Sequence, residues 1–181
     1  VGAEALIERW AAGECGVVDG LGDCREFDPA ALLDRRSARR SDRFTQLALV
    51  AAAEALEQAG WSGGAPVAAE RAGCVTRPGI AGSGTIEDQP DVLRERGPDA
   101  MTPLAIPLLM ANAASGAVAM RHDLKGQCYG TVSACAAGAH AIGAGLRMVQ
   151  HGDADACVVG GAESALTPLA TAAFPAVGAT S

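Results

Sequence analysis

Apolar residues recur every three or four positions in the stretch between residues 44 and 56. The positions are Phe44, Leu47, Ala48, Ala51, Ala55 and Leu56. Side chains at this spacing share one face of a helix. Ser41 or Asp42 can accept the free N–H groups of a first turn, so we expect a helix from there to about residue 59, ended by Gly60. A shorter run of the same kind predicts a helix over residues 3–12.

The stretch from residue 128 to residue 161 reads as a strand, a helix and a second strand. Residues 128–133 carry the β-formers Tyr129, Thr131 and Val132. Residues 134–150 are rich in small residues and long enough for a helix, and residues 154–159 form another short apolar run. A helix between two short strands predicts a right-handed parallel crossover. Because both strands are continuously apolar, we expect helices on both faces of the sheet.

The rest of the pattern alternates short apolar runs with turn residues. We expect a loop over residues 25–40, a strand over residues 71–76, a glycine-rich loop over residues 78–84, a polar helix or loop over residues 87–96, two buried helical pieces over residues 103–110 and 112–120, and a loop with a helix over residues 167–177. No internal repeat and no low-complexity linker divides the chain, so the pattern predicts one α/β unit.

Composition adds that the core consists of small side chains. Of 181 residues, 49% are hydrophobic but only 3% are aromatic. The 14 Lys and Arg residues against 21 Asp and Glu residues give a net charge of −7. Nucleic-acid binding needs clustered basic residues to neutralise phosphates. The only such cluster, Arg35, Arg36, Arg39 and Arg40, reads as a solvated loop or helix start, so we expect no nucleic-acid partner.

Neither of the two long uncharged stretches reads as a membrane segment. Residues 100–120 and 126–146 lack Asp, Glu, Lys and Arg but contain prolines or several glycines, so we expect buried elements and no membrane association. The six cysteines show neither C-x-x-C nor zinc-finger spacing. We therefore expect no metal site, free thiols and a cytoplasmic protein.

One cysteine stands where a strand turns into a helix, in the run Thr131-Val132-Ser133-Ala134-Cys135-Ala136-Ala137-Gly138. The thiolate is the reactive form of cysteine, and the positive end of a helix dipole stabilises it. The small neighbours leave room for a substrate, and the Cys135 N–H, without an intrahelical partner, can stabilise an oxyanion. Both a nucleophile and a buried structural cysteine fit this pattern.

A cysteine nucleophile needs an acid–base partner, usually histidine. His140 lies about 140° further around the same helix, so its side chain points away from Cys135. His151 lies at the far end of that helix, about 24 Å away. His122 lies in a loop before Lys125. No Cys–His pair is predicted, so Cys135 is either non-catalytic or paired with a residue outside this chain.

The chain from residue 131 onward resembles the β-ketoacyl-acyl-carrier-protein synthases of the thiolase-like superfamily. Residues 133–140, Ser-Ala-Cys-Ala-Ala-Gly-Ala-His, resemble the active-site cysteine motif of the KAS II-like enzymes. The other similar motifs are Asp42-Arg43-Phe44, Ala55-Leu56-Glu57-Gln58-Ala59-Gly60, Gly79-Ile80-Ala81-Gly82, Asn112-Ala113-Ala114-Ser115-Gly116, Gly152-Asp153-Ala154-Asp155, Gly160-Gly161-Ala162-Glu163 and Thr167-Pro168-Leu169. These motifs occur in the same order as in the family and are spread over essentially the whole chain. The set is therefore more specific than any one motif.

The resemblance implies an α/β fold, the thiolase-like layered αβαβα arrangement. It has a mixed sheet covered by helices and a buried helix that carries the nucleophile. Residues 1–181 would be a partial N-terminal domain, with the family's first strand and its C-terminal half outside the chain. That half supplies the family's two catalytic histidines, an assisting lysine and the second oxyanion donor. We therefore expect the chain alone to be inactive.

By the same resemblance, Cys135 would accept the acyl chain as a thioester, with its N–H in the oxyanion hole. Ile80, Ala105 and Ala134 would contact the acyl chain, and Glu163 would be a buried structural carboxylate. The implied partners are acyl carrier protein and a second copy of the chain in a homodimer. No metal and no cofactor of its own is implied, because the acyl groups travel on the phosphopantetheine of acyl carrier protein.

The implied reaction is the decarboxylative Claisen condensation of an acyl thioester with malonyl-acyl carrier protein in fatty acid chain elongation. Three alternatives stay open. A polyketide ketosynthase usually shows Cys-Ser-Ser where this chain has Cys135-Ala136-Ala137. A degradative thiolase has a different cysteine context and uses coenzyme A. A non-catalytic chain-length factor usually replaces the cysteine, which this chain retains.

Overall fold

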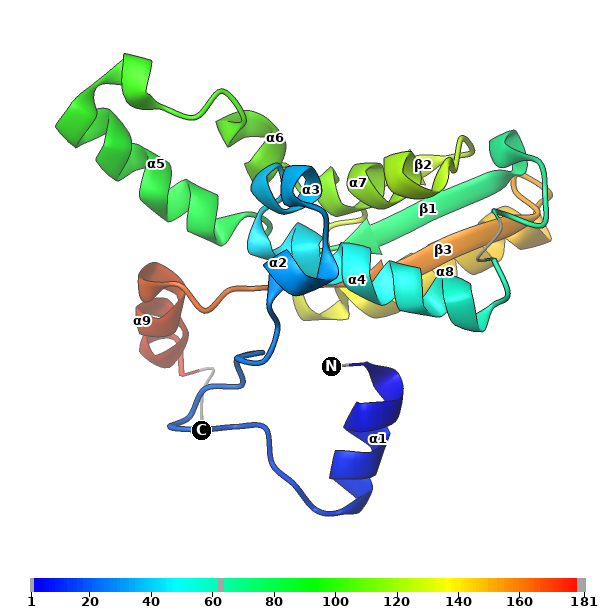
Figure 1. Ribbon diagram of the computed structural model, residues 1–181, viewed down its shortest axis with the longest axis horizontal. Helices are drawn as coiled ribbons and strands as arrows, with labels where there is room; N and C mark the ends of the chain where they lie inside the picture. The colour runs from blue at the N-terminus through cyan, green and yellow to red at the C-terminus, as the bar shows by residue number, and fades with distance from the viewer. Residues whose placement is uncertain (1, 62–63, 179–181) are drawn as a thin grey trace.

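The computed structural model describes residues 2–61 and 64–178. Its centre is a three-stranded sheet in the order β2-β1-β3 (Figure 1). The strands are β1 (Ala72–Arg77), β2 (Cys128–Tyr129) and β3 (Ala156–Gly161). Both pairings are parallel, and Cys74 of β1 lies opposite Cys128 on one side and Val158 on the other. The antiparallel member expected of a mixed sheet is not among the described strands.

Helices cover both faces of β1, which is buried along its whole length. On one face Cys74 packs against α4 (Arg43–Gln58) and α7 (Ala113–His122). On the other face Val75 packs against α8 (Ala137–Gln150). Successive residues of a strand point to opposite faces, so a strand covered on both sides needs a continuous apolar run. The prediction of helices on both faces is confirmed for β1. Of the two strands from which it was made, β2 is exposed and β3 is half-buried over most of its length.

The predicted crossover is present, since β2, α8 and β3 follow one another and both strands run parallel to β1. The two strands are not neighbours, because β1 lies between them. β2 is shorter than the six residues predicted, because the Ser115 side chain of α7 interrupts the ladder. The Ser115 hydroxyl accepts the Thr76 N–H at 2.9 Å and lies 2.9 Å from the Tyr129 carbonyl oxygen.

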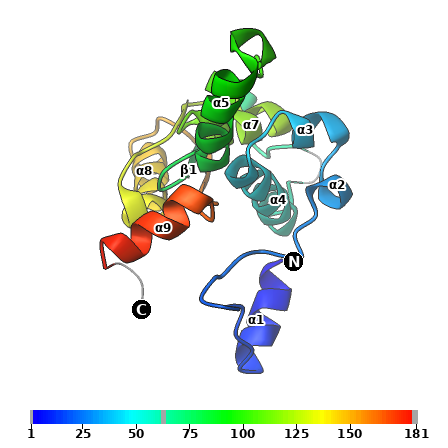
Figure 2. The same ribbon diagram turned by 90° about the vertical axis from the view of Figure 1, so that its left-hand side faces the viewer.

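The remaining elements surround this centre. They are the helices α1 (Ala3–Ala11), α2 (Pro29–Leu32), α3 (Arg35–Arg39), α5 (Ser83–Arg96), α6 (Ala105–Leu109) and α9 (Pro168–Ala176), and the 3-10 turns η1 (Ala69–Arg71), η2 (Pro98–Ala100) and η3 (Ala134–Ala136). α5 projects from the body beside α6, and α1 stands apart from the sheet (Figures 1 and 2). None of the nine residues of α1 is buried, and Glu54 of α4 accepts the Ala3 N–H at 2.7 Å.

Two predicted loops contain helices. α2 and α3 lie within residues 25–40, where the carboxylates of Asp28 and Asp34 accept backbone N–H groups of their first turns. α5 begins at Ser83, inside the predicted glycine-rich loop. The bounds of the predicted helices and strands elsewhere are confirmed to within a few residues. The helix predicted to be buried over residues 103–110 is α6, and Ala105 is its only buried residue.

α4 begins where the sequence predicts, but Asp42 does not cap it with its side chain. The Asp42 carboxylate instead accepts the N–H and the hydroxyl of Thr85 at 3.1 and 2.6 Å. It therefore ties α4 to the first turn of α5.

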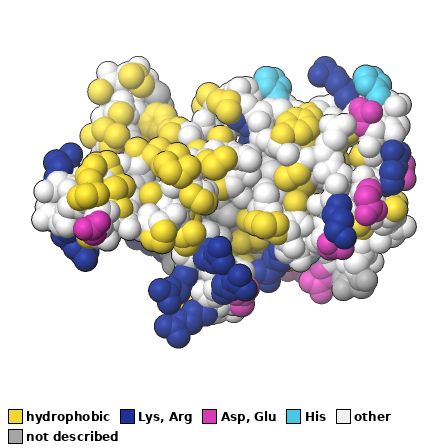
Figure 3. Space-filling model, turned by 90° about the horizontal axis from the view of Figure 1, so that it is seen from above, with side chains coloured by type: hydrophobic (Ala, Val, Ile, Leu, Met, Phe, Trp, Pro, Cys, Tyr) yellow, Lys and Arg dark blue, Asp and Glu magenta, His cyan; other side chains and the backbone are white. Residues whose placement is uncertain are grey.

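The surface on the side of α6, α7 and β2 is rich in apolar side chains (Figure 3). Ile106 of α6 is 66% exposed and Met120 of α7 is 81% exposed. Apolar surface alone does not make a membrane segment. Within the described ranges, no helix has the length and apolar character needed to span a membrane.

Candidate active site

Cys135 lies in a tight turn between β2 and α8. The residue before it, Ala134, has a φ of +45°, a conformation that residues other than glycine seldom adopt. η3 follows from Ala134 and leads directly into α8. Strained backbone of this kind persists only where its surroundings hold it, and it gathers at active sites. The predicted position of Cys135 between a strand and a helix is confirmed, with η3 inserted.

Two groups of Cys135 are free to react. Its thiol is exposed, and its backbone N–H has no hydrogen-bond partner among the described residues. Both groups lie just before α8, which has 14 residues. Unpaired N–H groups and the dipole at a helix start favour negative charge. The turn can therefore stabilise a thiolate nucleophile and an oxyanion formed beside it.

The loop after β1 lies against this turn. A Cβ added at Gly79 would lie 3.7 Å from the Ala134 carbonyl oxygen and 3.4 Å from Oε2 of Glu163. Glu163 accepts the Ile80 N–H at 2.6 Å through Oε2 and the Ser164 N–H at 2.7 Å through Oε1. Its carboxylate ties the loop after β1 to the segment after β3. Three residues predicted from the sequence, Ile80, Ala134 and Glu163, thus meet beside Cys135.

The exposure of these residues differs in part from expectation. Glu163 is half-buried and not buried, because it lies two residues beyond the end of β3 and binds N–H groups of loops. The Ile80 residue is 52% exposed. Ala105, the first residue of α6, is 8% exposed, and none of the apolar clusters formed by the described residues includes it. The last residues of α6 lie against the loop after β1, since a Cβ added at Gly82 would lie 2.7 Å from the Leu108 carbonyl oxygen.

None of the three histidines hydrogen-bonds to Cys135 in the described chain. His151 ends α8, and His122 is the last residue of α7, where a loop was expected. Burial lowers the pKa of His122. His140 makes a contact that the sequence reasoning missed: its Nδ1 lies 2.7 Å from Oγ of Ser133. The sequence feature that could have predicted this contact is a serine just before the Cys135 turn together with a histidine in the first turns of α8.

Arg77 is a second feature that the sequence pattern missed. It is 1% exposed, and its three guanidinium nitrogens have no hydrogen-bond partner among the described residues. Burial lowers the pKa of this guanidinium, because the charged form loses its hydration. The Arg77 carbonyl oxygen accepts the Ala162 N–H at 2.7 Å, so the residue also joins the end of β1 to the segment after β3. No carboxylate of the described chain lies within ion-pair distance of it.

Comparison with known proteins identifies the family. Residues 8–181 match the family described as beta-ketoacyl synthase, N-terminal domain. The chain belongs to the beta-ketoacyl synthase family. It is 42% identical over 159 residues to the 3-oxoacyl-[acyl-carrier-protein] synthase 2 of Coxiella burnetii, which is 88% of this chain and 38% of that protein. This beta-ketoacyl synthase chain therefore spans less than half the length of that relative.

Two solved structures resemble this beta-ketoacyl synthase chain. One is a beta-ketoacyl synthase from Burkholderia phymatum, with a TM-score of 0.75, 29% identity, and coverage of 86% of this chain and 38% of that one. The other comes from a complex of a type II PKS acyl-carrier protein with its ketosynthase. It has a TM-score of 0.72, 23% identity, and coverage of 82% of this chain and 43% of that one. The predicted thiolase-like α/β fold is confirmed by these neighbours.

The expectation of a buried nucleophile helix holds for one face of α8 in this beta-ketoacyl synthase chain. The buried positions are Ala137, Ala141, Gly145 and Met148. Ile142 is 58% exposed and Leu146 is 56% exposed, because they point away from the sheet. The described chain contains no element that covers this outer face of α8.

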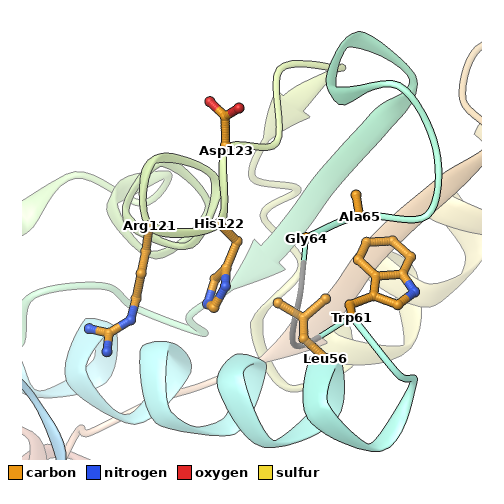
Figure 4. Close-up of a pocket in the computed structure, with 7 residues that line it drawn as sticks. All are labelled: Leu56, Trp61, Gly64, Ala65, Arg121, His122 and Asp123. Carbon is orange, nitrogen blue, oxygen red and sulfur yellow. The ribbon is translucent and has the colours of Figure 1, made fainter.

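A cavity of about 300 Å³ lies at the other end of β1 from Cys135. Its lining consists of Leu56, Trp61, Gly64, Ala65, Arg121, His122 and Asp123 (Figure 4). Figure 4 shows Arg121 and His122 pointing toward α4, and Asp123 pointing away. Trp61 packs against the cluster that contains Ala72, the first residue of β1. Because α/β sheets bind ligands beyond the carboxyl ends of their strands, this cavity is not part of the site around Cys135.

Proposed function

We propose that this chain is the N-terminal part of a 3-oxoacyl-acyl-carrier-protein synthase, an acyltransferase of fatty acid chain elongation. The main observation in its support concerns Cys135, which lies at the start of a helix. Its thiol is exposed, and its backbone N–H has no hydrogen-bond partner among the described residues. The family and the name of the relative from Coxiella burnetii support the proposal.

In the first step, the Cys135 thiolate attacks the thioester carbonyl of an acyl chain carried on phosphopantetheine. The Cys135 N–H is one of the donors that stabilise the oxyanion of the tetrahedral intermediate. The C–S bond to the carrier breaks, and the carrier thiolate leaves and takes up a proton. Cys135 then holds the acyl chain as a thioester.

In the second step, malonyl-acyl carrier protein loses CO₂, and the carbon nucleophile that remains attacks the Cys135 thioester. The C–S bond to Cys135 breaks, the thiolate is regenerated, and the 3-oxoacyl product leaves on the carrier protein. The groups that promote decarboxylation lie outside residues 1–181 in this proposal. We therefore expect the chain alone to form no condensation product.

Ile80, Ala105 and Ala134 are proposed to contact the acyl chain. The approach of the Gly79 loop to the Ala134 carbonyl supports this role for Ile80 and Ala134. For Ala105 the proposed contact with the acyl chain is based on the family resemblance alone. Glu163 is proposed as a structural carboxylate, because both of its oxygens already accept backbone N–H groups.

The proposed partners are acyl carrier protein and a second copy of the chain. Acyl carrier protein appears in the name of the relative and in one of the solved complexes. A homodimer is supported by β2, which lies at an edge of the sheet and can pair with another strand. We propose a cytoplasmic protein, in keeping with six free cysteines, and no metal, cofactor of its own, nucleic-acid partner or membrane association.

Transfer of a labelled acyl group to Cys135 tests this proposal. The complete protein is incubated with radiolabelled acyl-acyl carrier protein, and the labelled peptide is identified by mass spectrometry. We expect label on the peptide that contains Cys135, loss of the label in Cys135→Ala, and full labelling in the control Cys24→Ala, whose thiol is also exposed. Undiminished labelling of Cys135→Ala would rule the proposal out.

A polyketide ketosynthase is the second candidate, because one neighbour with the same fold comes from a type II PKS. The two are separated by adding excess malonyl-acyl carrier protein to the acylated protein. A single 3-oxoacyl product supports fatty acid elongation, and a product with several unreduced keto groups supports the polyketide reaction. A protein that takes no label at Cys135 would instead be a non-catalytic partner similar to a chain-length factor.

A further inference from the structure

The Cys135 turn is bridged by a hydrogen bond between its two arms. Ser133 lies just before η3, and His140 lies in the first part of α8. Nδ1 of His140 and Oγ of Ser133 are 2.7 Å apart, which is a short and well-formed hydrogen bond. This bond closes a ring of residues that contains Cys135.

The Ser133 hydroxyl does not cap the helical turn that follows it. A serine at the N-cap position normally accepts an N–H group from the first turn that follows it. Ser133 is the N-cap of η3, but its side chain makes no such bond. The hydroxyl is hydrogen-bonded to Nδ1 of His140 instead, and within the described residues the N–H of Cys135 has no acceptor. The bond to His140 holds Ser133 in an arrangement in which the proposed oxyanion donor is free.

The turn also needs support against strain. Ala134 adopts a φ of +45° between the two arms, a conformation that is unfavourable for a residue with a Cβ and persists only where the surroundings impose it. The Gly79 loop touches the turn from one side. The bond between Ser133 and His140 holds it from the helix side.

We propose that His140 is a positioning residue for acyl transfer: by binding the Ser133 hydroxyl, it fixes the Cys135 turn so that the Cys135 N–H faces the oxyanion. This inference rests on the proposed function, because it assigns a role in acylation of Cys135. His140 does not exchange a proton with the thiol, since it contacts Ser133 and not Cys135.

Two reactions of the same thiol separate positioning from general structural support. Acylation by an acyl thioester passes through an oxyanion and needs the aligned N–H. Alkylation by iodoacetamide forms the C–S bond as iodide leaves, without an oxyanion. In His140→Ala of the complete protein we expect acylation of Cys135 to slow by about tenfold or more, since loss of an oxyanion donor costs about 100-fold to 1,000-fold. Alkylation of Cys135, followed on its peptide, should change less than about twofold.

Further variants test the bond itself. Asn can place an amide atom where Nδ1 of His140 lies, so His140→Asn should recover most of the acylation rate. Ser133→Ala should slow acylation as much as His140→Ala, and the double variant should be no slower than either, because both remove the same bond. His151→Ala is the matched control, since His151 ends the same helix and none of its side-chain atoms forms a hydrogen bond within the described chain.

The outcomes are decisive for this inference. It is overturned if acylation of His140→Ala equals that of the unchanged protein, if acylation and alkylation slow in parallel, or if the effects of Ser133→Ala and His140→Ala multiply in the double variant. If Cys135 of the unchanged protein takes no acyl label, the proposed function fails, and that result is distinguishable from failure of the His140 role.

Discussion

Two cysteines of this chain have opposite surroundings. Cys135 is exposed at a helix start, whereas Cys74 in the middle of β1 is fully buried. Burial raises the pKa of the Cys74 thiol to about 12, and the nearby thiols of Cys128 and Cys157 act in the same direction. Cys74 therefore remains protonated and inert at neutral pH. Both residues are cysteines, but only the exposed position of Cys135 allows a thiolate to form and meet a substrate.

The raised pKa of Cys74 predicts weaker folding at alkaline pH. The pKa of this thiol is 9.0 in the unfolded chain and about 12 in the folded chain. The stabilising contribution of the protonated thiol is complete below pH 9 and is lost as the pH rises toward 12. Each such thiol adds a slope of up to about 1.4 kcal/mol per pH unit in this window. The free energy of unfolding of the complete protein, measured with urea at several pH values between about pH 8 and 10.5, gives this slope.

The variant Cys74→Ala should make this alkaline slope shallower, whatever its effect on stability at neutral pH. Cys15→Ala removes an exposed thiol and should leave the slope unchanged. Equal slopes in the unchanged protein and in Cys74→Ala would contradict the prediction.

At the scale of elements, α8 packs against β3 through a glycine. A Cβ added at Gly145 would lie 2.3 Å from Cγ1 of Val159 and 3.4 Å from Sγ of Cys157. Valine is branched at Cβ and has one dominant rotamer, so it cannot easily move aside. Gly143 on the same helix has nothing within 4 Å of the corresponding point. Close packing therefore requires a glycine at position 145, whereas position 143 has room for a side chain.

This difference predicts opposite effects of the same substitution. Gly145→Ala should lower the free energy of unfolding by about 1–3 kcal/mol, because it overpacks the contact between α8 and β3. Gly143→Ala should raise it by up to about 1 kcal/mol, because alanine favours the helix. Denaturant unfolding of both variants checks this. Destabilisation of the same size in both would show that close packing of α8 against β3 is not the cause.

At the scale of the whole molecule, apolar side chains remain uncovered on several elements. Ile142 and Leu146 on α8 are more than half exposed, Leu169 on α9 is 63% exposed, and Val132 beside the Cys135 turn is 75% exposed. Together with the apolar side chains over α6 and α7 (Figure 3), they exceed what scattered surface residues explain. This apolar surface is suited to packing against further protein.

We therefore expect residues 1–181, produced alone, to bind a hydrophobic dye and to associate in solution. Size-exclusion chromatography with light scattering follows the association. The double variant Ile142→Glu and Leu146→Glu should reduce both effects, and Gln150→Glu, which adds charge to the same helix, is the control. A monomer that melts cooperatively and binds no dye would contradict this expectation.

Much of the fold and part of the site were predictable from local patterns. The apolar spacing predicts α4, and Phe44, Ala48 and Leu56 do lie on its buried face. Ala51 and Ala55, which were expected on the same face, are exposed. The change from β-forming residues to small residues around Cys135 predicts the turn that carries this cysteine. The extent of β2 was not predictable, because Ser115, far from Tyr129 in sequence, ends the ladder. The role of Asp42 was not predictable either, because its partner Thr85 lies on another helix.

The sequence by itself determined most of the segments that become helices and strands and the place of Cys135 between a strand and a helix, because periodicity and turn residues act within a few positions of the chain. Only the tertiary structure decided which groups meet at the site. The carboxylate of Glu163 reaches the Ile80 N–H across 83 positions, and the Ser115 hydroxyl reaches Thr76 across 39. These contacts depend on how β1, β3 and α7 pack together, and no local pattern carries that information.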